Sequence, residues 1–200
     1  SVVNNMISPS ININDTTNAS GSLNFVEIAT SSAGYRITVT KSGYSTDRTY
    51  PIGGVGNPNP LNPDATVKEQ EITKIGFAID RLGTLIFKTQ DQMCKPTANI
   101  DFQQVGAKLI GTNPDVPKYS VATQTDSVGQ KTISDLEWDT YVFTNLDSEY
   151  EIAGSQPITP FAISPASSST IIWTVEPKTP KALLVSVLDE DLNLTNDASV

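Results

Sequence analysis

The chain of 200 residues carries a formal net charge of −9, and hydrophobic residues make up 38% of it, enough for a packed core. The acidic balance argues against nucleic-acid binding, which needs a basic surface, and no apolar run approaches the length of a transmembrane helix. There is no histidine and a single cysteine, Cys94, so histidine-based catalysis, zinc–histidine sites and an intrachain disulfide are excluded.

Alternation of apolar and polar residues with a period of two dominates the chain and predicts β-strands. In chain order, the alternating runs are residues 34–44, 74–80, 84–89, 170–177 and 183–191. The one helix-like stretch, residues 64–75, also contains the strand-favouring residues Thr66, Val67, Ile72 and Thr73. Residues typical of turns separate the runs. The sequence therefore predicts an all-β protein of antiparallel sandwiches, in which each sheet has one face in water.

The chain repeats itself at an interval of roughly a hundred residues, which indicates two like domains. Residues 16–25 match 123–133, residues 34–44 match 139–155, and residues 76–91 match 174–191. Each copy of the last block combines a closing strand, a short hinge and a new opening strand. Domain boundaries are therefore predicted near residues 81–83 and 177–181, which gives units of a normal size.

The repeated blocks share a pattern: a threonine and an asparagine or aspartate precede a glycine, and a strand with a tyrosine follows. The first copy supplies Thr17, Asn18, Gly21, Phe25, Gly34, Tyr35, Ile37, Val39, Gly43 and Tyr44, and the second supplies Thr125, Asp126, Gly129, Leu136 and Tyr141. These residues resemble the carboxypeptidase-regulatory-like domain, a transthyretin-like (prealbumin-like) sandwich. The chain is also similar to tandem modules of bacterial surface and pilin-like proteins. The resemblance implies two tandem transthyretin-like (Ig-like) β-sandwiches that serve as a spacer, stalk or binding accessory.

Elementary chemistry explains the residue types in this pattern. The asparagine or aspartate side chain can cap the turn before a strand, and glycine accepts a backbone angle that other residues resist. The tyrosine combines a large apolar body with a hydroxyl that can reach the backbone. The pattern therefore stabilises a fold and carries no chemistry of its own.

The two ends of the chain each resemble part of a domain. Residues 182–200 form a predicted strand, a turn and the start of another strand, whereas residues 1–15 open inside a strand. Joined end to start, they give the continuous strand "NDASVSVVNN". Within residues 183–200, Asn193 and Asp197 stand where the family usually has glycines. We therefore expect an incomplete N-terminal sandwich (1–81), a second sandwich (82–181) and a C-terminal strand segment (182–200).

The C-terminal segment is expected to complete the first domain of a neighbouring copy, which lacks its own opening strand. The link would be a strand donated between subunits or a covalent tandem array, and the alternative is that the segment starts a third domain. The predicted interface residues are Leu183, Leu184, Val185, Val187, Ala198, Val200, Val2 and Val3.

Carboxylates are the main candidates for chemistry. Asp189, Asp191 and Asn193 alternate as at the start of a calcium loop, but the glycine and distal glutamate of such a loop are absent. Glu137 and Asp139 flank Trp138, a pattern that a glycosidase pair could use, yet their spacing predicts that both face solvent from one side of a strand. We therefore predict no catalytic residue, no cofactor and no metal site.

Two features concern binding. Trp138 and Trp173 could form a sugar-stacking platform, although Trp173 alternates with Ile171 and Val175, which favours the core. The Pro-, Gly- and Asn-rich residues 51–65 form either a surface loop or a contact loop to a partner.

Together these patterns predict a non-enzymatic extracellular structural protein of the cell surface. It would be a subunit or stalk of a filament or pilus, joined head to tail to further copies of itself. The alternative is a carbohydrate-binding or adhesion module with a glycan ligand, and an accessory domain of a secreted hydrolase ranks third.

Overall fold

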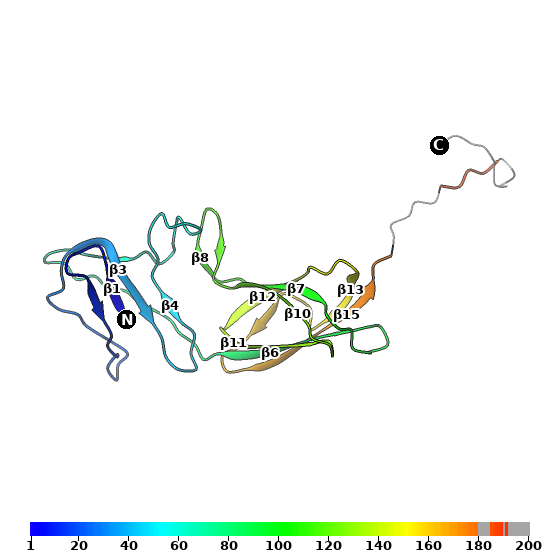
Figure 1. Ribbon diagram of the computed structural model, residues 1–200, viewed down its shortest axis with the longest axis horizontal. Coiled ribbons are helices and arrows are strands. Elements are labelled where there is room, and N and C mark those ends of the chain that lie inside the picture. Colours follow the sequence, from blue (N-terminus) through cyan, green and yellow to red (C-terminus); the bar gives the residue numbers. More distant parts are fainter. Residues whose placement is uncertain (180–184, 190, 192–200) are drawn as a thin grey trace.

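The computed structural model describes residues 1–179, 185–189 and 191, and this part of the chain contains β-strands and no helix. The strands fall into two units that follow one another along the long axis of the molecule (Figure 1). No helix capable of crossing a membrane occurs among these residues. The predicted all-β sandwich class is confirmed.

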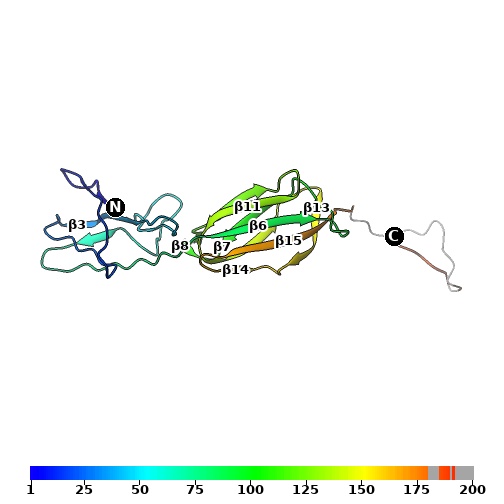
Figure 2. The same ribbon diagram turned by 90° about the horizontal axis from the view of Figure 1, so that it is seen from below.

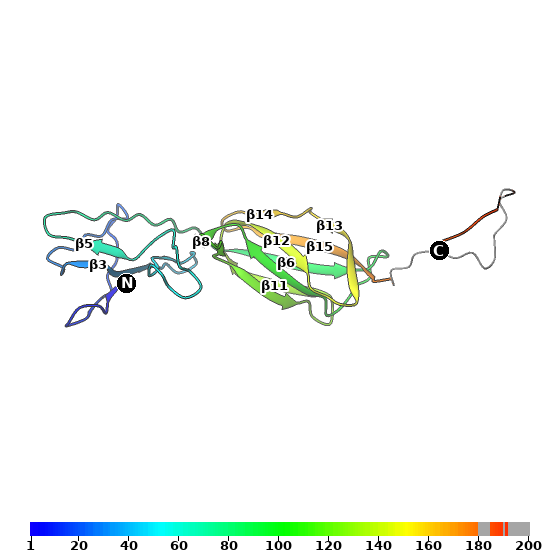
Figure 3. The same cartoon turned by 90° about the horizontal axis from the view of Figure 1, so that it is seen from above.

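The second unit is a sandwich of two four-stranded sheets. One sheet has the order β10-β7-β12-β14 and the other the order β11-β6-β15-β13 (Figures 2 and 3). Neighbouring strands are antiparallel except β6 and β15, which run parallel at the centre of the second sheet. The bounds are β6 (Gly83–Gln90), β7 (Asp101–Gly106), β10 (Ser120–Gln124), β11 (Gln130–Leu136), β12 (Asp139–Asn145), β13 (Tyr150–Gln156), β14 (Phe161–Ile163) and β15 (Ser168–Pro177).

The core of this sandwich is aromatic. The rings of Phe87 and Phe102 stack with centroids 4.0 Å apart, and Trp173 meets Phe87 edge-on at 4.9 Å. Ile171, Trp173 and Val175 of β15 are all buried, as their alternation predicts. Each such side chain contributes about 1.5–3 kcal/mol when it is fully buried.

The first unit contains a single irregular sheet of five strands. Its strands are β1 (Val2–Asn4), β2 (Ile11–Ile13), β3 (Ser31–Val39), β4 (Asp47–Arg48) and β5 (Ala65–Val67). The order is β2-β1-β3-β4, and β5 also pairs with β3. Only Val2, Tyr35 and Ala65 form its fully buried apolar core. A second, like-shaped sandwich over residues 1–81 is therefore not confirmed by these strands.

Two parts of the first unit that resemble strands in sequence carry none. Residues 14–30 and 68–80 have no assigned strand, so the strand predicted over residues 74–80 is wrong. The physical reason is that an alternating sequence forms a strand only when a neighbour pairs with its backbone groups. Residues 64–75 contain β5 and no helix.

A hydrogen-bonded junction connects the two units. The backbone N–H of Ser45 donates to Asp80 at 2.8 Å, and that of Leu82 donates to Gly43 at 3.0 Å, so the connecting residues are paired rather than free. Next to them lies a hairpin of the second unit, formed by β8 (Leu109–Gly111) and β9 (Val116–Pro117).

Residues 51–65 contact this hairpin, which identifies them as a contact loop within the chain. The side-chain amide of Asn57 donates to the carbonyl of Ile110 at 3.1 Å, and that of Asn59 donates to Thr112 at 3.1 Å. Backbone bonds from Leu61 to Ile110 and from Thr112 to Asn59, each 3.0 Å long, lie beside them. The loop thus braces one unit against the other.

Candidate functional site

The predicted interface residues lie in different surroundings. Val2 is 5% exposed, and its strand β1 is bonded to β2 on one side and β3 on the other, so β1 has no free edge for a donated strand. Val3 is half-buried in the same strand. Val185 is exposed and Val187 half-buried, whereas Leu183, Leu184, Ala198 and Val200 lie outside the described residues. The role of these eight residues at an interface stays a prediction.

The sheet of the first unit corresponds strand by strand to one sheet of the second. β1 pairs with β2 and β3 as β7 pairs with β10 and β12. The register agrees as well, because Tyr35 faces Ala65 of β5 and Tyr141 faces Phe161 of β14. The order β2-β1-β3-β5 is thus equivalent to β10-β7-β12-β14, which supports the internal repeat.

The turn after the edge strand is the same in both units. The Oδ1 atom of Asn18 accepts from the backbone N–H groups of Ser20 and Ser22, each at 3.0 Å. The Oδ1 atom of Asp126 accepts from Val128 at 3.0 Å and from Gln130 at 2.8 Å. Each turn continues into a glycine with positive φ, at 75° for Gly21 and 68° for Gly129. The equivalence therefore extends from Asn18 and Asp126 into the residues that follow.

The structures diverge after this turn. In the second unit residues 130–136 form β11, whereas the equivalent residues 22–28 form no strand. Both segments nevertheless contain a residue with a φ of 58° at equivalent positions, Glu27 in the first unit and Asp135 in the second. The first unit thus keeps the positive-φ position of β11 but not its hydrogen-bonded ladder.

The equivalent of β15 is residues 72–81. The antiparallel bridge between Tyr44 and Arg81 corresponds to the pair formed by Tyr150 and Pro177 at the end of β15. Counting back from these pairs, Ile75 is equivalent to Ile171, yet Ile75 is 39% exposed and Ile171 is 0% exposed. We call residues 22–28 and 72–81 the open segments. They expose apolar side chains, including Leu23 and Ile75, which are equivalent to Lys131 and to the buried Ile171.

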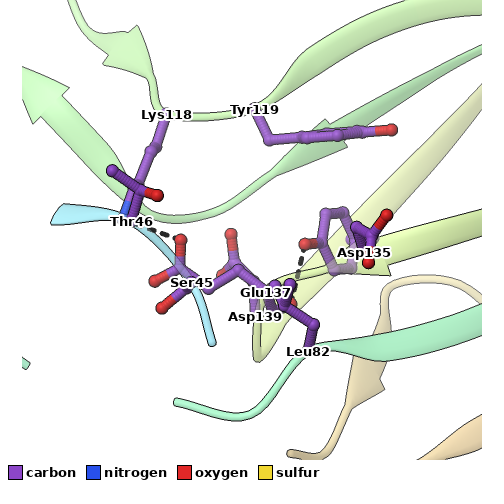
Figure 4. A pocket seen from close by; sticks show the side chains of 9 residues that line it. Ser45, Thr46, Leu82, Lys118, Tyr119, Asp135, Glu137 and Asp139 are labelled. Carbon is purple, nitrogen blue, oxygen red and sulfur yellow. Dashed lines mark hydrogen bonds and ion pairs between the residues drawn. The ribbon is translucent and has the colours of Figure 1, made fainter. Parts of the chain in front are cut away.

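The second candidate is a cavity of about 140 Å³ at the junction (Figure 4). Its lining combines residues of both units: Ser45, Thr46, Leu82, Lys118, Tyr119, Asp135, Glu137, Asp139 and Tyr141. The prediction that Glu137 and Asp139 face solvent is wrong, because Asp139 is buried and the Glu137 side chain is 15% exposed. Both point into this cavity, where positive and hydrogen-donating groups surround them.

Two of the carboxylates that line the cavity, Glu137 and Asp139, already have partners. Glu137 forms ion pairs with Lys108 at 2.8 Å and with Lys118 at 2.7 Å. Asp139 accepts from the backbone N–H groups of Lys108 at 3.0 Å and Thr140 at 2.7 Å. Burial, strengthened by the nearby charge of Asp139, raises the pKa of Tyr141, so its hydroxyl remains a donor. The arrangement ties Lys108 and Lys118, which flank the β8–β9 hairpin, to Glu137 just before β12.

The remaining candidates are also placed. Trp138 is 48% exposed, and the ammonium of Lys108 lies 4.6 Å from its ring centroid. Trp173 belongs to the core, so the two tryptophans do not form one platform. Asp189 accepts from the backbone N–H of Asp191 at 3.0 Å, and Asn193 lies outside the described residues. Over the described ranges, no group of three acidic, cysteine or histidine side chains could hold a metal ion.

Sequence reasoning missed the lysine partners of Glu137 and the amide bonds of Asn57 and Asn59. The repeated Asn-Pro pairs of residues 57–63 indicate a loop, but nothing in their spacing identifies a partner about fifty residues away. Comparisons of the chain with protein-family models, curated proteins and solved structures find no match. The resemblance to carboxypeptidase-regulatory-like domains therefore rests on the sequence motifs.

Proposed function

We propose that the protein is an extracellular structural subunit or stalk of a filament, pilus or other surface assembly, and that it has no enzymatic activity. Copies join head to tail, through strand complementation or as a tandem array. The observation that carries this proposal is the braced junction, which keeps two β units in line along one axis (Figure 2). A unit that transmits force or sets a distance needs such a stiff connection, whereas the usual expectation for two linked domains is relative motion.

The ion pairs and hydrogen bonds of the polar residues near the junction support a structural role. The largely buried carboxylates of Glu137 and Asp139 bind two lysine ammonium groups and backbone amides. Their fixed partners stabilise the orientation of the hairpin against the sandwich. The net charge of −9 keeps the surface hydrated and limits unspecific association.

Electron microscopy of the purified chain tests the proposal. At high protein concentration we expect linear assemblies whose axial repeat equals the length of one extended copy. Particles that remain single across the whole concentration range would contradict it. Panels of hydrolase and transferase substrates should give no turnover, and Glu137→Gln should leave that result unchanged.

The alternative is a carbohydrate-binding or adhesion module, which exposed Trp138 favours. The ammonium of Lys108 lies 4.6 Å from the centroid of its ring, and about half of the residue remains exposed for a sugar to stack on. A glycan array separates the two proposals. Binding that Trp138→Ala abolishes supports the adhesion module, and an empty array together with filaments supports the structural subunit.

A further inference from the structure

The second unit contains a central strand for which residues 1–81 have no equivalent. At the centre of its second sheet, β6 pairs antiparallel with β11 and parallel with β15. Leu85, Phe87 and Thr89 of β6 are all buried there. Residues 1–81 contain the equivalents of β11 and β15, which are the open segments, but no strand between them. The open segments therefore form no ladders because, within residues 1–81, no strand lies between them to pair with both.

The two turn glycines locate this strand position. In the second unit the N–H of Thr89 donates to the carbonyl of Gly129 at 2.8 Å. A Cβ atom placed on Gly129 would lie 2.7 Å from the carbonyl oxygen of Thr89, whereas a Cβ atom placed on Gly21 would meet nothing within 4 Å. The space beside Gly21 is thus open where β6 passes Gly129.

One other segment of the chain has the pattern of β6. Residues 182–189 read "ALLVSVLD" where residues 84–91 read "TLIFKTQD". Asp189 accepts from the backbone N–H two residues on, at 3.0 Å, as Asp91 accepts from Met93 at 2.9 Å. Aligned on these aspartates, Leu183, Val185 and Val187 take the places of Leu85, Phe87 and Thr89.

We propose that residues 183–189 of a second copy of this chain insert between the open segments of the first unit. The inserted strand runs antiparallel to residues 22–28 and parallel to residues 72–81, and it converts both into strands. This assignment rests on the proposed head-to-tail assembly and gives it a site, an orientation and a register.

The register follows from that of β6. Lys131 and Ile171 flank Phe87, so Val185 lies between Leu23 and Ile75. Leu23 is 38% exposed and Ile75 is 39% exposed in the single copy, and the inserted Val185 covers both. By the same count, Val187 faces Phe77, and its N–H donates to the carbonyl of Gly21.

The strand comes from another copy because its own chain is too short to return. β15 begins at Ser168 beside Thr84 near the junction and ends nine residues later at Pro177, about 30 Å away. Six residue steps separate Pro177 from Leu183, which span at most about 22 Å. They cannot run back along β15 and reach the first unit. The end of β15 lies at the opposite end of the second unit from the first unit (Figures 2 and 3), so insertion is head to tail and does not close on itself.

The test uses the full chain of 200 residues in sedimentation velocity over a range of concentrations, with hydrogen exchange measured by mass spectrometry. Wild type should form a concentration-dependent series of oligomers, with slowed exchange over residues 22–28 and 72–81. Val185→Asp should weaken the association constant by about tenfold or more, because it places a charge between two apolar side chains. The matched control is Ser186→Asp, on the opposite face of the strand as Lys88 is on β6, and it should associate as wild type does.

Four results overturn the inference. Equal association of Val185→Asp and wild type, or protection that falls outside the open segments, removes the inserted strand but leaves the proposed assembly in place. Equal loss in Val185→Asp and Ser186→Asp also removes the assigned register. Wild type that stays monomeric at every concentration removes both the strand insertion and the proposed function.

Discussion

Tyr35 and Tyr141 occupy equivalent positions in the two units, and each hydroxyl donates to a backbone carbonyl a few residues earlier in the chain. Tyr35 donates to Ala29 at 2.6 Å, and Tyr141 donates to Glu137 at 2.8 Å. Both side chains are almost fully buried. The matched blocks of the sequence therefore correspond to matched structure, although only one of the two units completes a sandwich.

Removing these hydroxyls should destabilise each unit separately. In Tyr35→Phe and Tyr141→Phe the ring stays in the core, but a carbonyl loses its donor. The expected loss is about 0.5–1.5 kcal/mol of unfolding free energy for each variant. Chemical denaturation measures the loss of unfolding free energy, and hydrogen exchange shows which of the two units has lost it. A loss in Tyr141→Phe that is spread evenly over both units would show that they unfold together.

The sequence predicted turns and buried strand faces better than it predicted which segments pair with one another. The Asn18 and Asp126 turns, the tyrosine hydroxyl bonds and the buried face of β15 all follow from residue type and alternation. The strand over residues 74–80 was wrong because alternation identifies which face is apolar and not whether a neighbouring strand is present. The junction could not be predicted, since Asn57 and Asn59 bond to backbone groups that no periodic pattern connects to them.

Asp147 should make the second unit sensitive to acid. Burial of this carboxylate opposes its ionisation, but the backbone N–H groups of Glu149, Tyr150 and Asp101 together outweigh that effect and lower its pKa from the ordinary value of 3.8. A lowered pKa in the folded state means that the stabilisation is present above the ordinary pKa and is lost as the pH falls through the folded pKa.

The matched variant for this pH dependence is Asp147→Asn. At neutral pH it should be less stable than wild type, and the difference should shrink as the pH falls below 3.8. Thermal unfolding of both proteins between pH 7 and pH 2 measures it. A difference that stays constant across that range would show that the charge of Asp147 contributes nothing to the stability.

Glu137 should matter for stability through its two ammonium partners. Glu137→Gln keeps the size of the side chain but removes the charge that faces Lys108 and Lys118. Because the three groups are mostly shielded from water, we expect a loss of about 1.5–3 kcal/mol in unfolding free energy. The control is Glu71→Gln, in an exposed pair with Lys68, where the loss should stay below about 1 kcal/mol. Equal losses in both variants would contradict a special role of the junction cluster.

Gly21 and Gly129 provide the sharpest comparison between the two units, because they adopt the same backbone angle in different surroundings. Alanine at either position should cost about 1 kcal/mol for its positive φ. Gly129→Ala should cost more than that, since its Cβ atom would lie 2.7 Å from the backbone oxygens of Thr89 and Thr97, which cannot move without disturbing β6.

In the single copy, Gly21→Ala should lose only the stability that its positive φ costs, because nothing lies within 4 Å of its Cβ atom. If a strand of a second copy passes Gly21 as β6 passes Gly129, that space is filled on assembly. Gly21→Ala should then weaken self-association while the isolated chain loses only about 1 kcal/mol of stability. Denaturation at low protein concentration measures the stability of the isolated chain, and sedimentation at high concentration measures its self-association. If Gly21→Ala associates as tightly as wild type, no strand passes this glycine; if it unfolds as easily as Gly129→Ala when monomeric, the space beside it is already occupied by its own chain.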